Sequence, residues 1–317
     1  MKENTFGLKS SKRIFILKTV VVLCLLSFLT YKIAFSSAWI SFRMIELVHP
    51  SFILVVVILM IFNWGLETLK WQILVKDIEY LSLKSAFKSV LAGLSSGLLT
   101  PNRIGNFIGR LAYIKKENHN QATINTLIGN LAQFISTILV GCTAMLFLVS
   151  SKFDFNHSNW VLCFSFLFIC AGSYVYFKPK VVDFYPLNLL LNKDTKRSIE
   201  QIQGAKSYNK FKVLMLSIMR YFIFCVQYYL LFQAFGLVIS SFLLFGLIAV
   251  VFLITTLIPS LLFGKLFVRE SVAVFVFSMV SIDVSLILMV SFLLWLINLA
   301  IPAVVGSVFW LKQQRYA

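Results

Sequence analysis

The sequence predicts an all-α polytopic membrane protein with about eight transmembrane helices plus one or two re-entrant or broken segments. Of its 317 residues, 59% are hydrophobic and only 13% are charged, whereas about a quarter of the residues in a soluble domain are charged. The mean hydropathy is +0.88. Continuous apolar runs such as 242–258 lack the alternation of transmembrane strands and are typical of spanning helices.

Spanning the bilayer takes about 20 apolar residues, and several stretches reach this length. These full-length candidates are 14–35, 50–72, 123–149, 159–177, 213–236, 240–258 and 284–309. Two weaker segments, 85–100 and 266–281, each adjoin a break that contains proline and glycine. The first run has no small-residue cleavage site after it, so we expect an uncleaved helix rather than a signal peptide.

Loop charges predict the orientation, because Lys and Arg crowd cytoplasmic loops. The loops 36–49, 150–158 and 236–240 are poor in Lys and Arg and should face outward. The basic segments, which should be cytoplasmic, are the N-terminus, 70–88, 103–116, 178–212 and the C-terminus. This distribution accounts for the net charge of +17, so nucleic acid is not an expected partner.

Two neighbouring basic segments, 70–88 and 103–116, should lie on the same side of the membrane. Segment 85–100 between them should therefore enter the membrane and return. The small residues Gly93, Ser95, Ser96 and Gly97 would form the tight reversal. Backbone of that kind needs surrounding protein or a water-filled cavity. A short tilted crossing that violates the charge rule is the alternative.

The chain reads as one integral-membrane domain, 1–317, whose halves, approximately 1–177 and 213–317, are joined by the cytoplasmic loop 178–212. Similar breaks occur in both halves. The first is Pro101-x3-Gly105-x4-Arg110, and the second is Pro259-x4-Gly264-x4-Arg269 followed by Glu270. Paired interruptions of this kind indicate an internal repeat and a transporter's binding site, although chance similarity is a competitor.

The residue types at the breaks suit an anion. Proline ends a helix, and a helix that starts after the break points free N–H groups and its positive dipole end at the gap. Arginine adds a fork that matches phosphate. We therefore expect Arg110 and Arg269 to form a phosphate or carboxylate cradle; snorkelling of both side chains to the interface is the alternative.

Other polar residues lie within the apolar runs. Asn63, Glu67 and Lys70 share one face of the second span, and an interfacial position is expected for the two charged residues. Arg220 lies inside the span 213–236, so it needs a partner unless it snorkels. The candidates are Glu67, Glu270 and a lipid phosphate.

No catalytic or metal site is expected. The five cysteines lie in apolar runs without a CxxC pair, and the three histidines are far apart. No Walker motif is present, so direct ATP use is not expected, and no cofactor is predicted. A helix-packing seam is expected on 123–149, with the residues Asn125, Gly129 and Gln133.

At the two breaks the sequence resembles the integral-membrane, flippase-like domain of lysylphosphatidylglycerol synthase. Members read Pro-x-Arg-x-Gly-Glu-x-x-x-Arg at the first break, and Asn106 stands here where Glu is usual. The matching residues are Pro101, Arg103, Gly105 and Arg110 at the first break, and Pro259, Gly264, Arg269 and Glu270 at the second. Lys265 and Phe267 stand where small residues are common.

The resemblance implies a bacterial inner (plasma) membrane protein that moves a lipid between leaflets. Full synthases of the family carry a soluble aminoacyl-transferase domain, and this chain has no room for one after Trp310, so no enzyme activity is expected. The expected ligand is an anionic phospholipid or a lipid-linked phosphate. A separate lipid-modifying synthase is a candidate partner, and a homo-oligomer stays open.

The expected site has three parts. Arg110, Arg269, Arg103 and Arg220 would bind the lipid phosphate. Pro101, Gly105, Pro259 and Gly264 would shape the cavity, and Glu270 and Glu67 would be charge partners. Two rival functions stay open: a membrane enzyme that acts on lipid-linked substrates, for which Asp283 and Glu270 are the acid–base candidates in the second half, and a non-transporting accessory subunit.

Overall fold

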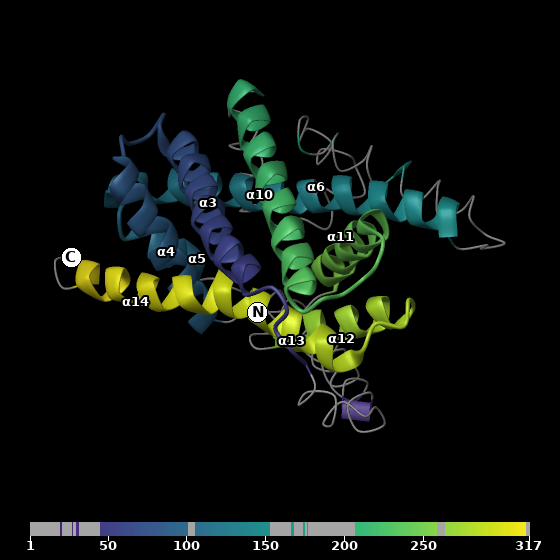
Figure 1. The fold of residues 1–317 in the computed structure, drawn as a ribbon. Helices are drawn as coiled ribbons and strands as arrows, with labels where there is room; N and C mark the ends of the chain where they lie inside the picture. The colour runs from purple at the N-terminus through teal and green to yellow at the C-terminus, as the bar shows by residue number, and fades with distance from the viewer. Residues whose placement is uncertain are drawn as a thin grey trace, which may run out of the picture.

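The computed structural model describes residues 45–100, 105–152, 207–258 and 264–314, with a few isolated residues elsewhere. Every regular element in these ranges is helical (Figure 1). The helices of the first half are α3 (Pro50–Val75), α4 (Leu83–Leu99), α5 (Gly105–Leu111), the 3₁₀ turn η2 (Lys116–Asn118) and α6 (His119–Lys152). Those of the second half are α10 (Ser207–Ala234), α11 (Ser241–Leu257), α12 (Gly264–Ser278), α13 (Val284–Trp295), the π-helical turn η4 (Leu296–Ala300) and α14 (Ile301–Gln314).

Four stretches of the described chain are long and apolar enough to cross a membrane. They are Pro50–Val75, Lys116–Leu148, Asn209–Ala234 and Val284–Gln313, and they correspond to the predicted spans 50–72, 123–149, 213–236 and 284–309. The predicted span 240–258 is the shorter apolar helix α11, of 17 residues. The multi-pass helical membrane protein is thus confirmed, whereas the full span count and the internal repeat stay predictions.

Several sequence-based expectations fall outside the described residues. The predicted spans 14–35 and 159–177 lie almost entirely outside them, as does most of the loop 178–212. The same holds for three expected site residues: Pro101, Arg103 and Pro259.

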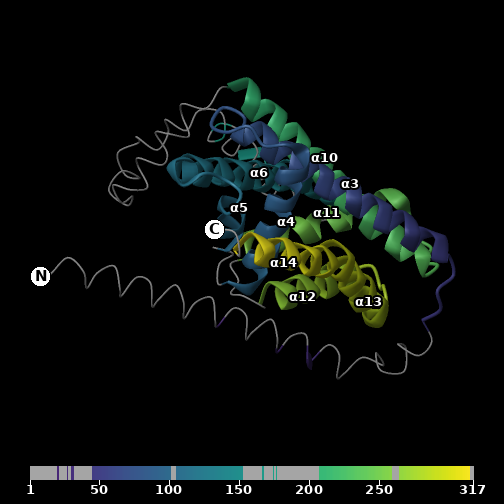
Figure 2. The ribbon, with the colours of Figure 1, turned by 90° about the vertical axis from the view of Figure 1, so that its left-hand side faces the viewer.

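Helices distant in sequence pack side by side. α10 runs along α3, and the two lie together in both views (Figures 1 and 2). α6 packs against α10 and α11, and α14 packs along α4. Helices of the two halves are therefore intermixed, which brings polar residues from α3 and α10 to a common interior.

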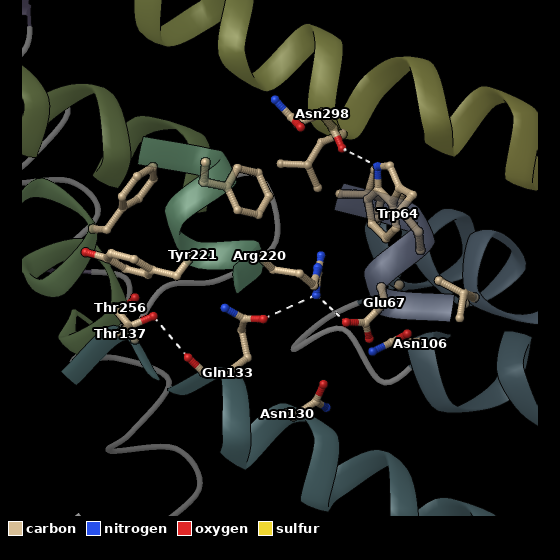
Figure 3. Close-up of a pocket in the computed structure, with 18 of the residues that line it drawn as sticks. Trp64, Glu67, Asn106, Asn130, Gln133, Thr137, Arg220, Tyr221, Thr256 and Asn298 are labelled. Carbon is tan, nitrogen blue, oxygen red and sulfur yellow. Dashed lines mark hydrogen bonds and ion pairs between the residues drawn. The ribbon is translucent and has the colours of Figure 1, made fainter. Parts of the chain in front are cut away.

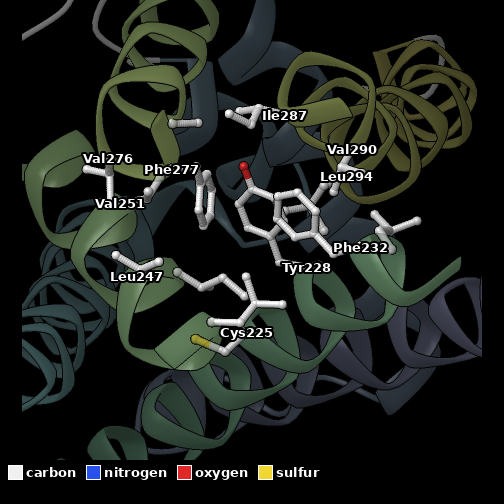
Figure 4. Close-up of a cluster of buried hydrophobic side chains, with 14 of the residues drawn as sticks. Cys225, Tyr228, Phe232, Leu247, Val251, Val276, Phe277, Ile287, Val290 and Leu294 are labelled. Carbon is white, nitrogen blue, oxygen red and sulfur yellow. The ribbon is translucent and has the colours of Figure 1, made fainter. Parts of the chain in front are cut away.

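Aromatic residues fill the core between α10, α12 and α13. Tyr228 and Phe232 are stacked with ring centroids 5.4 Å apart, and Phe277 meets the two rings edge-on at 5.7 and 5.0 Å (Figure 4). Edge-on and stacked pairs of this kind add to the stabilisation from burial. This core fixes α12, which carries Arg269, against α10.

A second core joins α3, α4 and α14. Trp71 is fully buried there, and its indole N–H donates to Ser89 Oγ at 3.0 Å. Gly306 of α14 lies so close to Leu91 that a Cβ at this glycine would overlap the Leu91 backbone. The absence of a side chain therefore permits the close approach of α14 to α4.

The chain reverses between α4 and α5, which pack against each other. The prediction that Gly93, Ser95, Ser96 and Gly97 form the turn is wrong, because these residues lie inside α4, which runs to Leu99. Their small size instead lets α5 approach closely. Entry and return on the same membrane side stays a prediction.

Hydrogen bonds and small residues lock this hairpin. Ser96 Oγ donates to the carbonyl oxygen of Gly105 at 2.6 Å, and the N–H of Gly105 donates to Thr100 Oγ1 at 2.6 Å. A Cβ at Gly109 would overlap the carbonyl of Ala92. Two short helices are thereby held together at a distance that larger residues would prevent.

The two breaks begin their following helices in the same way. α5 starts at Gly105 and α12 starts at Gly264. Arg110 and Arg269 therefore occupy equivalent places, about one and a half turns into their helices. Each break also separates a 17-residue helix, α4 or α11, from the helix that carries the arginine.

Candidate functional site

A cavity of about 310 Å³ lies between the helices of both halves (Figure 3). Its lining comes from α3, α4, α5, α6 and from α10 to η4. Five charged side chains reach it: Glu67, Lys70, Arg110, Arg220 and Arg269. All five are buried, so their interactions are only weakly screened by solvent.

Glu67 is the centre of the charge cluster. Its Oε1 accepts from Arg110 Nη2 at 2.7 Å, and its Oε2 pairs with Lys70 Nζ at 2.6 Å and with Arg220 Nη1. Helices α3, α5 and α10 supply these four residues. One carboxylate thus neutralises one of three positive charges.

Glu67 and Lys70 are covered by other helices and are only 4% and 1% exposed; their depth relative to the membrane interface stays a prediction. α10 and α6 cover this end of α3. Lys70 Nζ reaches across to the carbonyl oxygen of Gly129 on α6, at 3.3 Å. Burial is tolerated because each charge has an oppositely charged or hydrogen-bonding neighbour.

Arg220 is held by polar partners on two other helices. Its Nε donates to Asn63 Oδ1 at 2.7 Å, and its Nη1 donates to Gln133 Oε1 at 3.3 Å as well as to Glu67. Of the two protein partners weighed for this arginine, Glu67 is the one that it contacts; the lipid phosphate stays a prediction. The guanidinium also lies over the Trp64 ring, 5.5 Å from its centroid, so this arginine is held among the helices.

Arg110 is fixed by its own helix and by α3. Its Nε donates to Asn106 Oδ1 at 3.1 Å, and its guanidinium lies over the Trp71 ring at 5.0 Å. The uncharged side chain of Asn106 thus accepts a hydrogen bond from this arginine. A glutamate at this position would add a negative charge beside the cluster, so asparagine leaves the cavity more positive.

The second break contributes a separate ion pair. Arg269 Nη2 contacts Glu270 Oε1 at 2.9 Å and donates to the carbonyl oxygen of Ser291 at 2.6 Å. Within the described part of the chain, neither Arg269 Nε nor Glu270 Oε2 has a hydrogen-bond partner. The structure therefore brings Arg269 to the cavity that Arg110 lines; joint binding of one phosphate stays a prediction.

Further donors remain open on the first-half side of the cavity. Among the described residues, no acceptor contacts Nη1 of Arg110 or Nη2 of Arg220. Guanidinium N–H groups around a buried space suit the oxygens of a phosphate or carboxylate. The described residues hold no cluster of three or more metal-ligating side chains.

Several lining residues were not expected from the sequence. Asn130, Thr137 and Thr255 give polar groups on α6 and α11, and Asn298 lies on η4. Trp64 donates its indole N–H to the Asn298 carbonyl at 3.2 Å (Figure 3). The sequence could have indicated these residues, because polar side chains within apolar helices often line a functional interior. Pro101, Arg103 and Pro259 cannot be placed at the site, because they lie outside the described residues.

Comparison with known proteins gives one family. The model of the family described as "Lysylphosphatidylglycerol synthase TM region" matches residues 15–306. No curated protein and no solved structure matches the chain.

Proposed function

The chain belongs to the family of the lysylphosphatidylglycerol synthase TM region, and from this membership we propose that it binds a phosphate-bearing lipid and moves it between the leaflets of a bacterial plasma membrane. Membership and the apolar helices suggest a membrane protein of lipid metabolism or translocation. Flippase activity, the bacterial membrane and cytoplasmic termini are part of the proposal. So is the lack of enzyme activity.

One observation carries the proposal: a cavity among apolar helices is lined by four buried cations and one carboxylate. Charged residues inside the membrane are costly and usually mark a path for a polar substrate. Arg110, Arg220 and Arg269 can each present N–H groups to phosphate oxygens. The headgroup of a passing lipid would occupy this cavity.

An apolar hollow beside the same helices supports a lipid as the substrate. It measures about 640 Å³ and lies between α6, α10 and α11. Its lining includes Leu139, Phe222, Phe242, Phe245 and Ala249. We propose that the acyl or prenyl chains lie in this hollow while the headgroup lies in the polar cavity.

Transport in vesicles tests the proposal. The purified full chain is reconstituted with acyl-labelled fluorescent phosphatidic acid and, separately, phosphatidylglycerol, and loss of inner-leaflet label to a membrane-impermeant quencher is followed. We expect faster loss than in protein-free vesicles. The double variant Arg110→Ala/Arg220→Ala should lose this rate, and Lys84→Ala, which removes an exposed cation, should keep it.

Two results would contradict the proposal. Equal rates with and without protein, for both lipids, argue against a flippase; co-purification with a lipid-modifying synthase would then favour an accessory subunit. Chemical conversion of the labelled lipid would instead favour a membrane enzyme.

A further inference from the structure

The charges of the polar cavity do not balance. Lys70, Arg110 and Arg220 surround the single carboxylate of Glu67, which leaves two positive charges without a negative partner. Arg269 and Glu270 form a pair of their own and add no net charge. No other acidic residue is among the described residues that line the cavity.

The surplus is buried rather than solvated. Lys70, Arg110 and Arg220 are only 1%, 5% and 7% exposed. A buried charge that lacks a partner is strongly unfavourable, whereas a partner of opposite sign offsets the lost hydration. The binding free energy should therefore be most favourable for a ligand whose negative charges equal the surplus positive charges of the cavity.

We propose that the cavity selects a lipid whose phosphate end carries two negative charges, a phosphomonoester, over a singly charged phosphodiester. This inference rests on the proposed function and narrows its substrate class. A phosphodiester leaves one buried cation unpaired, and a terminal phosphate leaves none. A terminal phosphate also offers three oxygens to the open donors.

The donors around the cavity match such a group. Arg110 and Arg220 approach Glu67 from different helices, and each keeps a guanidinium nitrogen without a described acceptor. Arg269 lines the same cavity from another helix, α12. Asn106 accepts a hydrogen bond from Arg110 without adding a charge, so the surplus stays at two.

Binding to the purified full chain in a neutral detergent tests the proposal. The probes are phosphatidic acid, farnesyl phosphate, phosphatidylglycerol and inorganic phosphate, at about pH 7.5, where a phosphomonoester is mostly doubly charged. We expect phosphatidic acid and farnesyl phosphate to bind at least about tenfold more tightly than phosphatidylglycerol, in line with the coupling of close charge pairs. Inorganic phosphate should bind more weakly than either.

A variant with a lower positive charge in the cavity provides a second test of the proposal. Lys70→Met removes one surplus charge, so the advantage of the doubly charged lipids should shrink about tenfold while phosphatidylglycerol binding changes little. Lys84→Met, an exposed lysine on α4, is the matched control and should leave the preference unchanged. Should Lys70→Met not fold, the wild type still decides. Its preference for phosphatidic acid should fall as pH drops through about 6, the second ionisation of a phosphomonoester.

The outcomes separate the two proposals. Equal affinity for phosphatidic acid and phosphatidylglycerol at the higher pH overturns the charge selection and leaves a phosphate-lipid flippase standing. If inorganic phosphate binds as tightly as the lipids, the cavity recognises free phosphate, and the proposal that the bound phosphate belongs to a lipid is contradicted. No binding of any lipid counts against the proposed function itself.

Discussion

Glu67 and Arg220, 153 positions apart in the sequence, form a buried ion pair that joins α3 to α10. The same carboxylate holds Arg110 of α5 and Lys70 of its own helix. One acidic residue therefore ties three helices to the wall of the cavity.

Removal of the carboxylate should destabilise the protein. Glu67→Gln leaves three buried cations without a counter-charge, and breaking a buried pair in this way costs about 3–5 kcal/mol. Thermal unfolding in detergent should show a clearly lowered midpoint. Glu46→Gln, at an exposed position, is the control. High phosphate should raise the Glu67→Gln midpoint more than that of the wild type. An unchanged midpoint in the variant would mean that the cluster is not formed.

The two motif arginines should act on one ligand. Loss of a charge-assisted contact, about 1.5–3 kcal/mol, should weaken phosphatidic acid binding roughly tenfold to a hundredfold in Arg110→Ala or Arg269→Ala. The double variant should lose less than the sum, because both residues serve one ligand. Arg110→Lys should fall between wild type and alanine, since lysine keeps the charge without the fork. Wild-type affinity in the double variant would end the cradle hypothesis.

The hairpin of α4 and α5 should not accept a methyl group. Gly109→Ala would push a Cβ into the carbonyl of Ala92, and overpacking of this kind costs about 1–3 kcal/mol. Gly65→Ala is the matched control, because no atom lies within 4 Å of a Cβ there, and alanine is the better helix former. Thermal unfolding should therefore separate the two variants. If both melt alike, α5 does not pack on α4 as described.

Labelling of single cysteines in a cysteine-free background tests the re-entrant path. Lys84→Cys and Lys115→Cys, both at exposed positions, should react with a membrane-impermeant reagent only when the cytoplasmic side is open. Val238→Cys, 97% exposed between α10 and α11, should react from outside in intact cells. Opposite sidedness of positions 84 and 115 would show a true crossing. The loop 178–212 should label from the cytoplasm at Lys193→Cys.

Local signals predicted most of the helices. Pro50 marks the start of α3, where proline is favoured, and the apolar runs anticipated α6, α10, α11 and α13–α14. The arginine positions after each break were also predicted, because spacing along one helix is a local property. Helix starts, apolar runs and the spacing along one helix can be predicted without knowing which helix packs against it.

The burial of Glu67 and Lys70 was not predicted, because it depends on partners remote in sequence. Lys70 meets Gly129, 59 positions away, and Glu67 meets Arg220. A charge near the end of a span looks interfacial until another helix covers it. Likewise, Gly93 and Gly97 look like turn residues, and only the position of α5 shows that they serve close packing.

The π-helical turn η4 (Leu296–Ala300) sets the rotation of the last helix about its own axis. A π-helical turn holds one residue more than the α-helical path it replaces. If Leu296–Ala300 formed ordinary α-helix with the same number of residues, the extra residue would rotate the 14 residues of α14 by about 100°. Gly306 would then leave Leu91, and a residue with a side chain would meet that backbone. The π-helical geometry of this turn therefore decides which residue of α14 faces α4.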